Sequence, residues 1–119
     1  MHLPSAGDVI WVDLDPIAGT EQAGRRPALV LTPRSYHEKS QRSVICPITR
    51  KVRAWPWEVL LSDGLQTQGV VLVDQVRTID RTERMFGFIE AVPDQVLAEV
   101  LGRLASLLGV NRSFPAIEP

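Results

Sequence analysis

Short apolar runs, rich in Val, Ile and Leu, alternate along this chain with Pro, Gly and charged residues. Five of these runs fall at residues 8–14, 28–32, 43–48, 57–61 and 69–73. Runs of this length between turn-forming residues are typical of β-strands. A further pair at 75–79 and 86–91, with the polar residues 81–84 as the turn between them, would complete a sheet. The sequence therefore predicts a mainly β fold, a small antiparallel barrel.

The pattern changes after Pro93. Apolar residues then recur three or four positions apart, at Val96, Leu97, Val100, Leu101, Leu104, Leu107 and Leu108. This spacing gives one apolar face to a helix, which we expect to pack on the barrel. Pro93 and Asp94 suit its first turn and Gly109 its end. With 119 residues the chain makes one domain, expected over residues 1–110, and residues 111–119 are expected to form a loose tail.

Composition argues against several classes of protein. The apolar runs are far shorter than the ~20 residues of a membrane helix, and Met1 is not followed by a basic region and an apolar stretch. We therefore expect a cytoplasmic protein without a membrane partner. A single cysteine, Cys46, cannot form an internal disulfide, and the two histidines give no metal-ligand spacing. No metal and no cofactor are expected.

Positive charge is concentrated in one part of the chain. The formal net charge is −1, yet residues 25–53 contain only one acid, Glu38. The same segment holds eight basic residues, namely Arg25, Arg26, Arg34, Lys39, Arg42, Arg50, Lys51 and Arg53. Because charges farther apart than ~8 Å are largely screened at physiological salt, a local basic field attracts phosphates whatever the net charge. The segment favours a nucleic-acid partner; the alternative is that these side chains only solvate loops.

Four motifs follow one another along the chain, at residues 7–16 (GDVIWVDLDP), 19–31 (GTEQAGRRPALVL), 46–49 (CPIT) and 73–80 (VDQVRTID). In the second, Glu21 precedes paired arginines and Pro27 then fixes the backbone, so that a polar loop is joined to a rigid strand. In these motifs and their order the chain resembles the MazF, PemK and Kid toxins of bacterial toxin-antitoxin modules, which are sequence-selective endoribonucleases. The resemblance covers roughly residues 7–109. It implies an SH3-like barrel with a C-terminal α-helix.

The resemblance also implies that single-stranded RNA is cleaved without a metal, by attack of its own 2′-hydroxyl. Such a reaction requires a base for that hydroxyl, a proton for the leaving 5′-oxygen and stabilisation of a charged phosphorane. Arg26 matches the family's essential arginine, whose planar fork can hold two phosphoryl oxygens, and Thr49 matches the threonine beside it. Glu21 is either the general base or a residue that orients Arg26. The alternatives are an Arg26–Glu21 ion pair and an ordinary strand threonine.

One position departs from the Kid pattern. Asp74 matches the active-site aspartate of Kid-like members, but Leu72 stands where those members carry an arginine. This departure favours Arg26 and Thr49 as the residues that carry the chemistry. Asp74 and Gln75 are expected either to shape a pocket for an RNA base or to form hydrogen bonds within the barrel.

Further candidates for RNA binding are the basic side chains Arg25, Arg50, Lys51 and Arg53. Trp55 lies in a loop between Ala54 and Pro56, where it is expected to stack on a base or on the antitoxin. Trp11 and Trp57 are expected in the core. His37 lies outside every matching motif and is expected to be a solvated loop histidine rather than a catalytic acid or base.

A homodimer and a MazE-like antitoxin are further implications of the resemblance, with a disordered antitoxin segment lying across the RNA groove. Two alternatives belong to other classes. One is a non-enzymatic DNA gyrase inhibitor of the CcdB type, and the other is an inactive RNA-binding or repressor partner of an antitoxin. CcdB-type toxins act through a C-terminal end that contains tryptophan, whereas every Trp here precedes Glu58.

Overall fold

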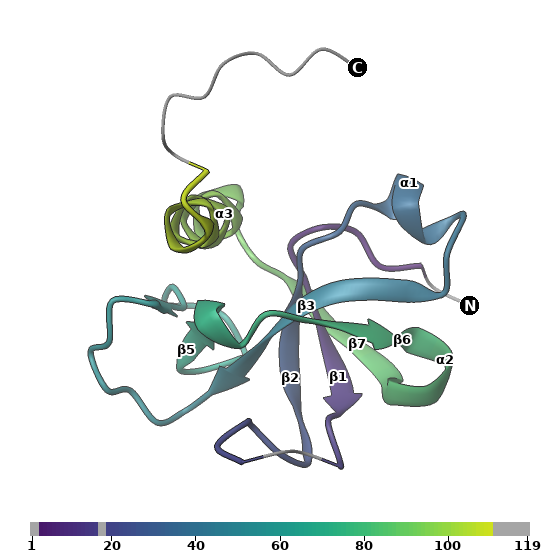
Figure 1. Ribbon diagram of the computed structural model, residues 1–119, viewed down its shortest axis with the longest axis horizontal. Helices are drawn as coiled ribbons and strands as arrows, with labels where there is room; N and C mark the ends of the chain where they lie inside the picture. The colour runs from purple at the N-terminus through teal and green to yellow at the C-terminus, as the bar shows by residue number, and fades with distance from the viewer. Residues whose placement is uncertain (1–2, 17–18, 111–119) are drawn as a thin grey trace.

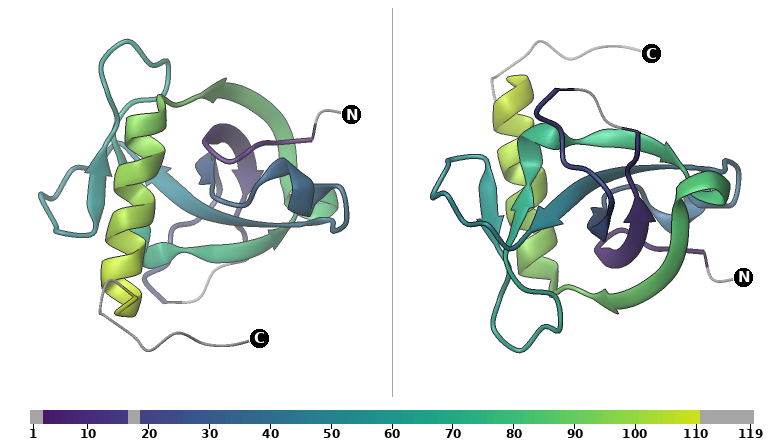
Figure 2. Two further views of the ribbon diagram at one scale, coloured as in Figure 1. Left: turned by 90° about the horizontal axis from the view of Figure 1, so that it is seen from above. Right: turned by 90° about the horizontal axis from the view of Figure 1, so that it is seen from below.

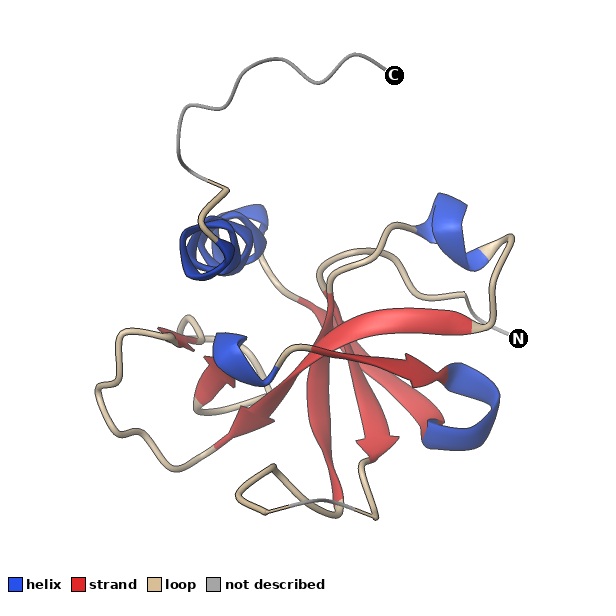
Figure 3. Ribbon diagram, in the orientation of Figure 1, coloured by secondary structure: helices blue, strands red, loops and turns tan. Residues whose placement is uncertain are grey.

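The computed structural model of the chain describes residues 3–16 and 19–110. In these residues, seven strands and a C-terminal helix account for most of the regular structure (Figures 1 and 3). The strands are β1 (Asp8–Asp13), β2 (Arg25–Val30), β3 (Arg42–Thr49), β4 (Glu58–Leu60), β5 (Val70–Leu72), β6 (Arg77–Asp80) and β7 (Met85–Ala91). The helical segments are α1 (Arg34–His37), the 3-10 turn η1 (Val73–Gln75), α2 (Arg81–Arg84) and α3 (Asp94–Leu108). The predicted tail at 111–119 lies outside the described residues.

All seven strands belong to one antiparallel sheet in the order β4-β5-β3-β2-β1-β7, with β6 paired to β3 outside this path. Strand β3 is shared, because Arg42 to Ile45 pair with β6 whereas Ile48 and Thr49 pair with β5. In the described part of the chain β4 and β7, at the two ends of the path, do not pair with each other. The predicted mainly β fold is thus confirmed, as a strongly bent sheet that does not close into a complete barrel (Figure 2).

Buried side chains form two apolar clusters on the two faces of the inner strands. Alternation along β1 sends Ile10 and Val12 to one cluster and Val9 to the other. Helix α3 covers the cluster that contains Val9, and it contributes Val96 and Val100 to this cluster, as the spacing of its apolar residues predicts (Figure 1). The helix ends at Gly109, which takes the left-handed conformation with φ 77°. No helix in the described residues is long and apolar enough to cross a bilayer.

Three local predictions need correction. Strand β2 begins at Arg25 rather than at residue 28, so both arginines belong to the strand and not to the loop before it. Asp74 and Gln75 lie in the turn η1, and the strand that follows starts only at Arg77. The expected turn at residues 81–84 is the short helix α2, whose N-terminus is capped by the Asp80 carboxylate, which accepts a hydrogen bond from the Thr82 amide at 2.9 Å.

His37 is buried, with 3% of its surface exposed, and the expectation of a solvated histidine is wrong. Its Nδ1 lies 2.7 Å from the Pro4 carbonyl. Because a carbonyl only accepts, the ring carries its proton on Nδ1 and its Nε2 accepts from the hydroxyls of Thr32 at 2.7 Å and Ser43 at 2.8 Å. Sequence reasoning missed this role because Pro4 and Ser43 reach His37 only through the fold. The residue thus fastens the N-terminal segment to β3.

The burial of His37 makes the stability of the protein sensitive to mild acid. Desolvation lowers the pKa of His37 below its ordinary value of 6.5, so the unfolded chain binds this proton at higher pH than the folded protein. The stability that neutral His37 contributes is complete above the ordinary value and is lost as the pH falls through the folded pKa. We expect the free energy of unfolding in urea to decrease between about pH 7 and about pH 5. The decrease should be smaller in His37→Gln; an equal decrease in both proteins would contradict this assignment.

Candidate active site

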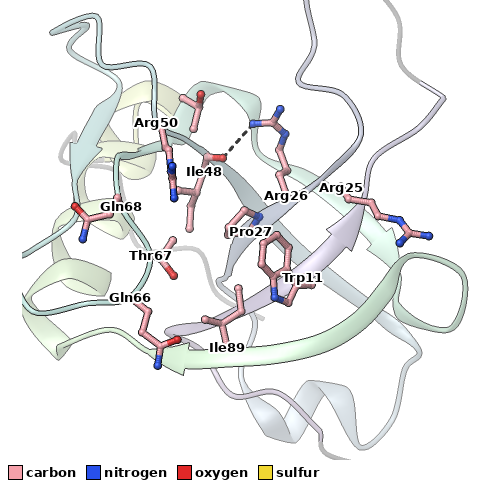
Figure 4. A pocket seen from close by; sticks show the side chains of 11 residues that line it. Trp11, Arg25, Arg26, Pro27, Ile48, Arg50, Gln66, Thr67, Gln68 and Ile89 are labelled. Atoms are coloured by element: carbon pink, nitrogen blue, oxygen red, sulfur yellow. Dashed lines mark hydrogen bonds between the residues drawn. The ribbon is translucent and has the colours of Figure 1, made fainter.

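Arg26 is held at the start of β2 by two backbone carbonyls. Strand β1 pairs Val12 with Arg26 and fixes the direction of its backbone. The guanidinium then donates from Nε to the Ala23 carbonyl at 3.0 Å and from Nη1 to the Ile48 carbonyl at 3.2 Å (Figure 4). These two bonds orient the fork on the surface between β2 and β3. An arginine oriented in this way can offer its remaining N–H groups to an anion without a large loss of side-chain entropy.

Beside Arg26 lies an open groove with a volume of about 420 Å³. Its floor is formed by Pro27 and Ile48, and Thr49 and Arg50 continue from the end of β3. Figure 4 shows Trp11 and Arg25 on one side of this groove and Gln66, Thr67 and Gln68 on the opposite side. We call it the arginine groove. It combines guanidinium groups with hydroxyl and amide groups, which is a donor set suited to phosphate oxygens.

Thr49 connects the arginine groove to a second cavity of about 400 Å³. That cavity is lined by Lys51, Arg53, Trp55, Asp74 and Gln75, among others. The predicted catalytic residues Arg26 and Thr49 and every predicted RNA-binding residue therefore line one of two hollows that meet at the end of β3. The Thr49 hydroxyl accepts a hydrogen bond from the Lys51 amide at 3.2 Å, which holds it at this junction.

Glu21 is not among the residues that line the arginine groove or the second cavity. It is exposed and lines a third cavity with Pro47 and Arg77, which shares Thr20, Gln22, Asp74 and Gln75 with the second one. The loop that carries Glu21 is fastened to η1, because the Gln22 amide donates to Gln75 Oε1 at 2.9 Å. The structure thus brings Arg26 and Thr49 together and places Glu21 in the neighbouring hollow.

The loop between β1 and β2 is also held by Arg84. Its Nη1 donates to the carbonyls of Asp13 at 3.0 Å and Asp15 at 2.7 Å, and Asp15 Oδ1 accepts from the Gly24 amide at 3.0 Å. These bonds connect the start of β7 to both ends of the loop. The position of Arg26 therefore depends on a residue that lies far from it in sequence.

Trp55 and Asp74 form a pair. The indole is 51% exposed, as predicted, and its Nε1 donates to Asp74 Oδ2 at 3.2 Å. This bond fixes the ring beside the second cavity while its face stays open to solvent. Asp74 and Gln75 each accept a hydrogen bond within the protein, and each also lines the second cavity. Their role in shaping a pocket for an RNA base stays a prediction.

The sequence prediction misses one wall of the arginine groove, the segment Gln66, Thr67 and Gln68. Glu90 of β7 anchors this wall by accepting from the amides of Gln66 at 3.0 Å and Thr67 at 2.7 Å and from the Thr67 hydroxyl at 2.7 Å. Partial burial of Glu90 opposes ionisation, but these hydrogen bonds outweigh it, so the pKa of the carboxyl is lowered. No signal in the sequence connects residue 90 to this loop.

Trp11 is not a core residue as predicted, because 40% of its surface is exposed beside the arginine groove. It lies on the same face of β1 as Asp13, two residues further on. A polar residue at this spacing was the available sequence signal that this face of the strand is exposed. Trp57, by contrast, is partly buried and packs against the core cluster under α3, in agreement with the prediction.

The described residues do not favour a cysteine nucleophile or a metal site. Burial, and to a smaller extent the Asp74 charge, raises the pKa of the Cys46 thiol to about 12, so Cys46 is a poor nucleophile at neutral pH. No group of three or more His, Cys, Asp or Glu side chains in residues 3–16 and 19–110 is placed to hold a metal ion. The candidate site is therefore one of arginines, hydroxyls and amides.

A small bent sheet is covered by one helix and carries an arginine and a threonine on a basic groove, an arrangement suited to contacts with anionic groups. The chain belongs to the family of PemK-like, MazF-like toxins of type II toxin-antitoxin systems, whose family model matches residues 5–108. The family resemblance read from the four motifs is thereby confirmed.

Relatives of known name agree with this family. The endoribonuclease toxin MazF of Escherichia coli K12 is 47% identical over 78 residues, which cover 66% of this chain and 69% of that protein. The endoribonuclease PemK of Escherichia coli is 41% identical over 106 residues, covering 86% of this chain and 80% of PemK. The crystal structure of MazF from Deinococcus radiodurans superposes with a TM-score of 0.87 at 43% identity and covers 92% of this chain and 99% of that one. A MazE-MazF structure from the same organism gives a TM-score of 0.81 at 44% identity, covering 93% and 100%.

Proposed function

We propose that this protein is the toxin of a toxin-antitoxin module and a metal-independent endoribonuclease that cleaves single-stranded RNA at a short recognition sequence, so that translation stops. The observation that carries the proposal is the placement of Arg26 and Thr49 on one groove in a chain whose relatives are endoribonucleases. The 2′-oxygen loses its proton to a base and attacks the adjacent phosphorus, the bond from phosphorus to the 5′-oxygen breaks, and the 5′-oxygen takes up a proton from water. A 2′,3′-cyclic phosphate and a 5′-hydroxyl end result.

Each residue has a role that follows from its chemistry. Arg26 holds the scissile phosphate and stabilises the negative charge of the phosphorane, because its very high pKa makes it a poor proton donor but a permanent cation. The Thr49 hydroxyl donates to a phosphate oxygen. Glu21, in the adjacent hollow, either accepts the 2′-hydroxyl proton or only orients Arg26 and orders its own loop.

The RNA backbone on either side of the cut is held by electrostatic contacts. Arg25 and Arg50 lie on the arginine groove, and Lys51 and Arg53 lie on the second cavity. Because these cavities meet at Thr49, a single strand can pass from one to the other across the catalytic residues. Trp55, with its ring fixed by Asp74, offers a face on which a base in the second cavity can stack.

The partners follow from the same surface. We propose a homodimer and a MazE-like antitoxin, because a MazE-MazF crystal structure is among the structures that this chain resembles at more than 40% identity. An acidic, disordered antitoxin segment would compete with RNA for the basic grooves. We place the protein in the cytoplasm, where its mRNA substrate is found. The gyrase-inhibitor alternative loses its support, since the family model and the relatives are those of MazF and PemK.

The decisive experiment is incubation of the purified protein with a long single-stranded RNA in EDTA, followed by mapping of the cut sites by primer extension. We expect discrete cuts that share a short sequence and that disappear when the nucleotide before the cut carries a 2′-deoxyribose. RNA that stays intact across varied sequences and salt concentrations would refute the proposal. Cleavage that persists at the 2′-deoxy position would refute the 2′-hydroxyl mechanism.

A further inference from the structure

An aromatic stack lies on the outer surface of β1 and β7 and is not used by the proposed catalytic mechanism. The rings of Trp11 and Phe86 stack with centroids 6.1 Å apart and an interplanar angle of 20°. The guanidinium carbon of Arg25 lies 5.0 Å from the centre of the Phe86 ring. Two rings and a cation from three different strands thus form one surface, which we call the aromatic platform.

The aromatic platform remains open to solvent. Trp11 is 40% exposed and Phe86 is 50% exposed, although aromatic side chains of this size contribute most to stability when fully buried. The backbone places the two rings side by side, because β1 pairs Trp11 with Gly87, the residue that follows Phe86. The platform is therefore preformed.

The aromatic platform continues the arginine groove. Trp11 and Arg25 line that groove together with Arg26 and Thr49. Phe86 stacks on Trp11 at the edge of the groove and also lines the neighbouring cavity with Phe88. A strand whose phosphate sits at Arg26 would carry the next nucleotides past Trp11 and Phe86. Base faces stack on aromatic rings and on arginine planes, and the phosphates between them pair with arginines. The chemistry of the platform, aromatic faces within a basic field, is that of a site for an unpaired base.

We propose that Trp11, Phe86 and Arg25 form a stacking subsite for one unpaired base of the RNA, outside the catalytic step. This inference rests on the proposed function, because it assigns part of the same substrate. The subsite sets how far recognition extends beyond the cut phosphate. It also gives Trp11, which the core does not use, a role in binding.

The test measures binding of an RNA that contains the recognition sequence and flanking nucleotides, with a 2′-deoxyribose at the cut so that it is not cleaved. Each flanking base is removed in turn by an abasic substitution, and the dissociation constant is measured by fluorescence anisotropy. In the wild-type protein we expect one abasic position to weaken binding about tenfold, the size of one base–aromatic stack. Phe86→Leu, which keeps an apolar side chain but removes the ring face, should weaken binding of the intact RNA by a similar factor.

The loss of affinity caused by the abasic position and the loss caused by Phe86→Leu should not add. The abasic position that weakens binding by the wild type should raise the dissociation constant of Phe86→Leu less than about twofold. In the matched control Phe88→Leu, the same abasic position should raise the dissociation constant as much as it does in the wild type. Phe88 lies two residues along β7 and is 47% exposed; it borders the same cavity as Phe86, beside Leu3 and Met85, but it is not one of the three residues of the aromatic platform. Thermal unfolding of each variant checks that the fold is kept. Phe86→Tyr, which keeps an aromatic ring, should bind the RNA with an affinity close to that of the wild type.

Two results would overturn the subsite. One is wild-type affinity of Phe86→Leu for every RNA. The other is a change in oligomeric mass of Phe86→Leu with unchanged RNA affinity, which would assign the platform to a contact between two copies of the chain. Cleavage of unmodified RNA by the wild type separates this failure from that of the proposed function, because the nuclease assignment stands if cleavage is seen and fails if it is not.

Discussion

Arg26→Ala is expected to lower the single-turnover rate of RNA cleavage by about a hundredfold or more, the usual cost of removing one donor that stabilises transition-state charge. The residue sits in the arginine groove with its fork already oriented by the carbonyls of Ala23 and Ile48. Alanine removes both the cation and its geometry. The measurement is the rate constant with enzyme in excess over a short RNA.

Arg26→Lys is the matched control, because it keeps the charge but not the planar fork. We expect it to recover only a small part of the lost rate. Full activity in Arg26→Lys would mean that charge alone is needed, and full activity in Arg26→Ala would remove Arg26 from the chemistry. Because Arg26 is only partly buried, both variants should keep a thermal unfolding temperature close to that of the wild type, which separates lost catalysis from lost folding.

The second large effect is expected at Gly69, which has φ +112°. A Cβ atom at this position would lie 2.1 Å from the Thr49 carbonyl oxygen and 2.9 Å from Arg50 Cα. Gly69→Ala must therefore displace the end of β3, where Thr49 faces the groove and pairs with Val70. We expect a loss of about 2 to 5 kcal/mol in the free energy of unfolding, from backbone strain and steric conflict together, and impaired RNA cleavage by the protein that still folds.

Gly64→Ala separates the two causes. Gly64 also has a positive φ, +90°, but no atom of the described residues lies within 4 Å of a Cβ built there. This variant should carry only the backbone cost of about 1 to 3 kcal/mol, with cleavage unchanged. Urea unfolding of both variants measures the difference. Equal losses at the two positions would show that the contact with Thr49 has no influence on stability.

The site could be predicted from sequence where function depends on residue type within a continuous segment. Arg26 and Thr49 were both identified in motifs and both line the arginine groove. Trp55 was expected to be exposed because it lies between turn-forming neighbours, and it is. Prediction failed where the role of a residue depends on a partner from a distant segment. His37 is buried by Pro4 and Ser43, and Trp11 lies on the surface where it stacks on Phe86 of β7.

The strand-rich fold, the C-terminal helix and the family could all be predicted from the amino-acid sequence, because periodicity, turn residues and motifs are local properties of the chain. Which side chains contact one another depends on how the sheet is folded in space. Glu90 supports the wall of the groove opposite Arg25, Arg84 holds the loop before β2, and Trp11 meets Phe86. These contacts join segments that the sheet brings together from across the whole chain, and hydrogen bonds and ring stacking act over a few ångströms in space regardless of separation in sequence.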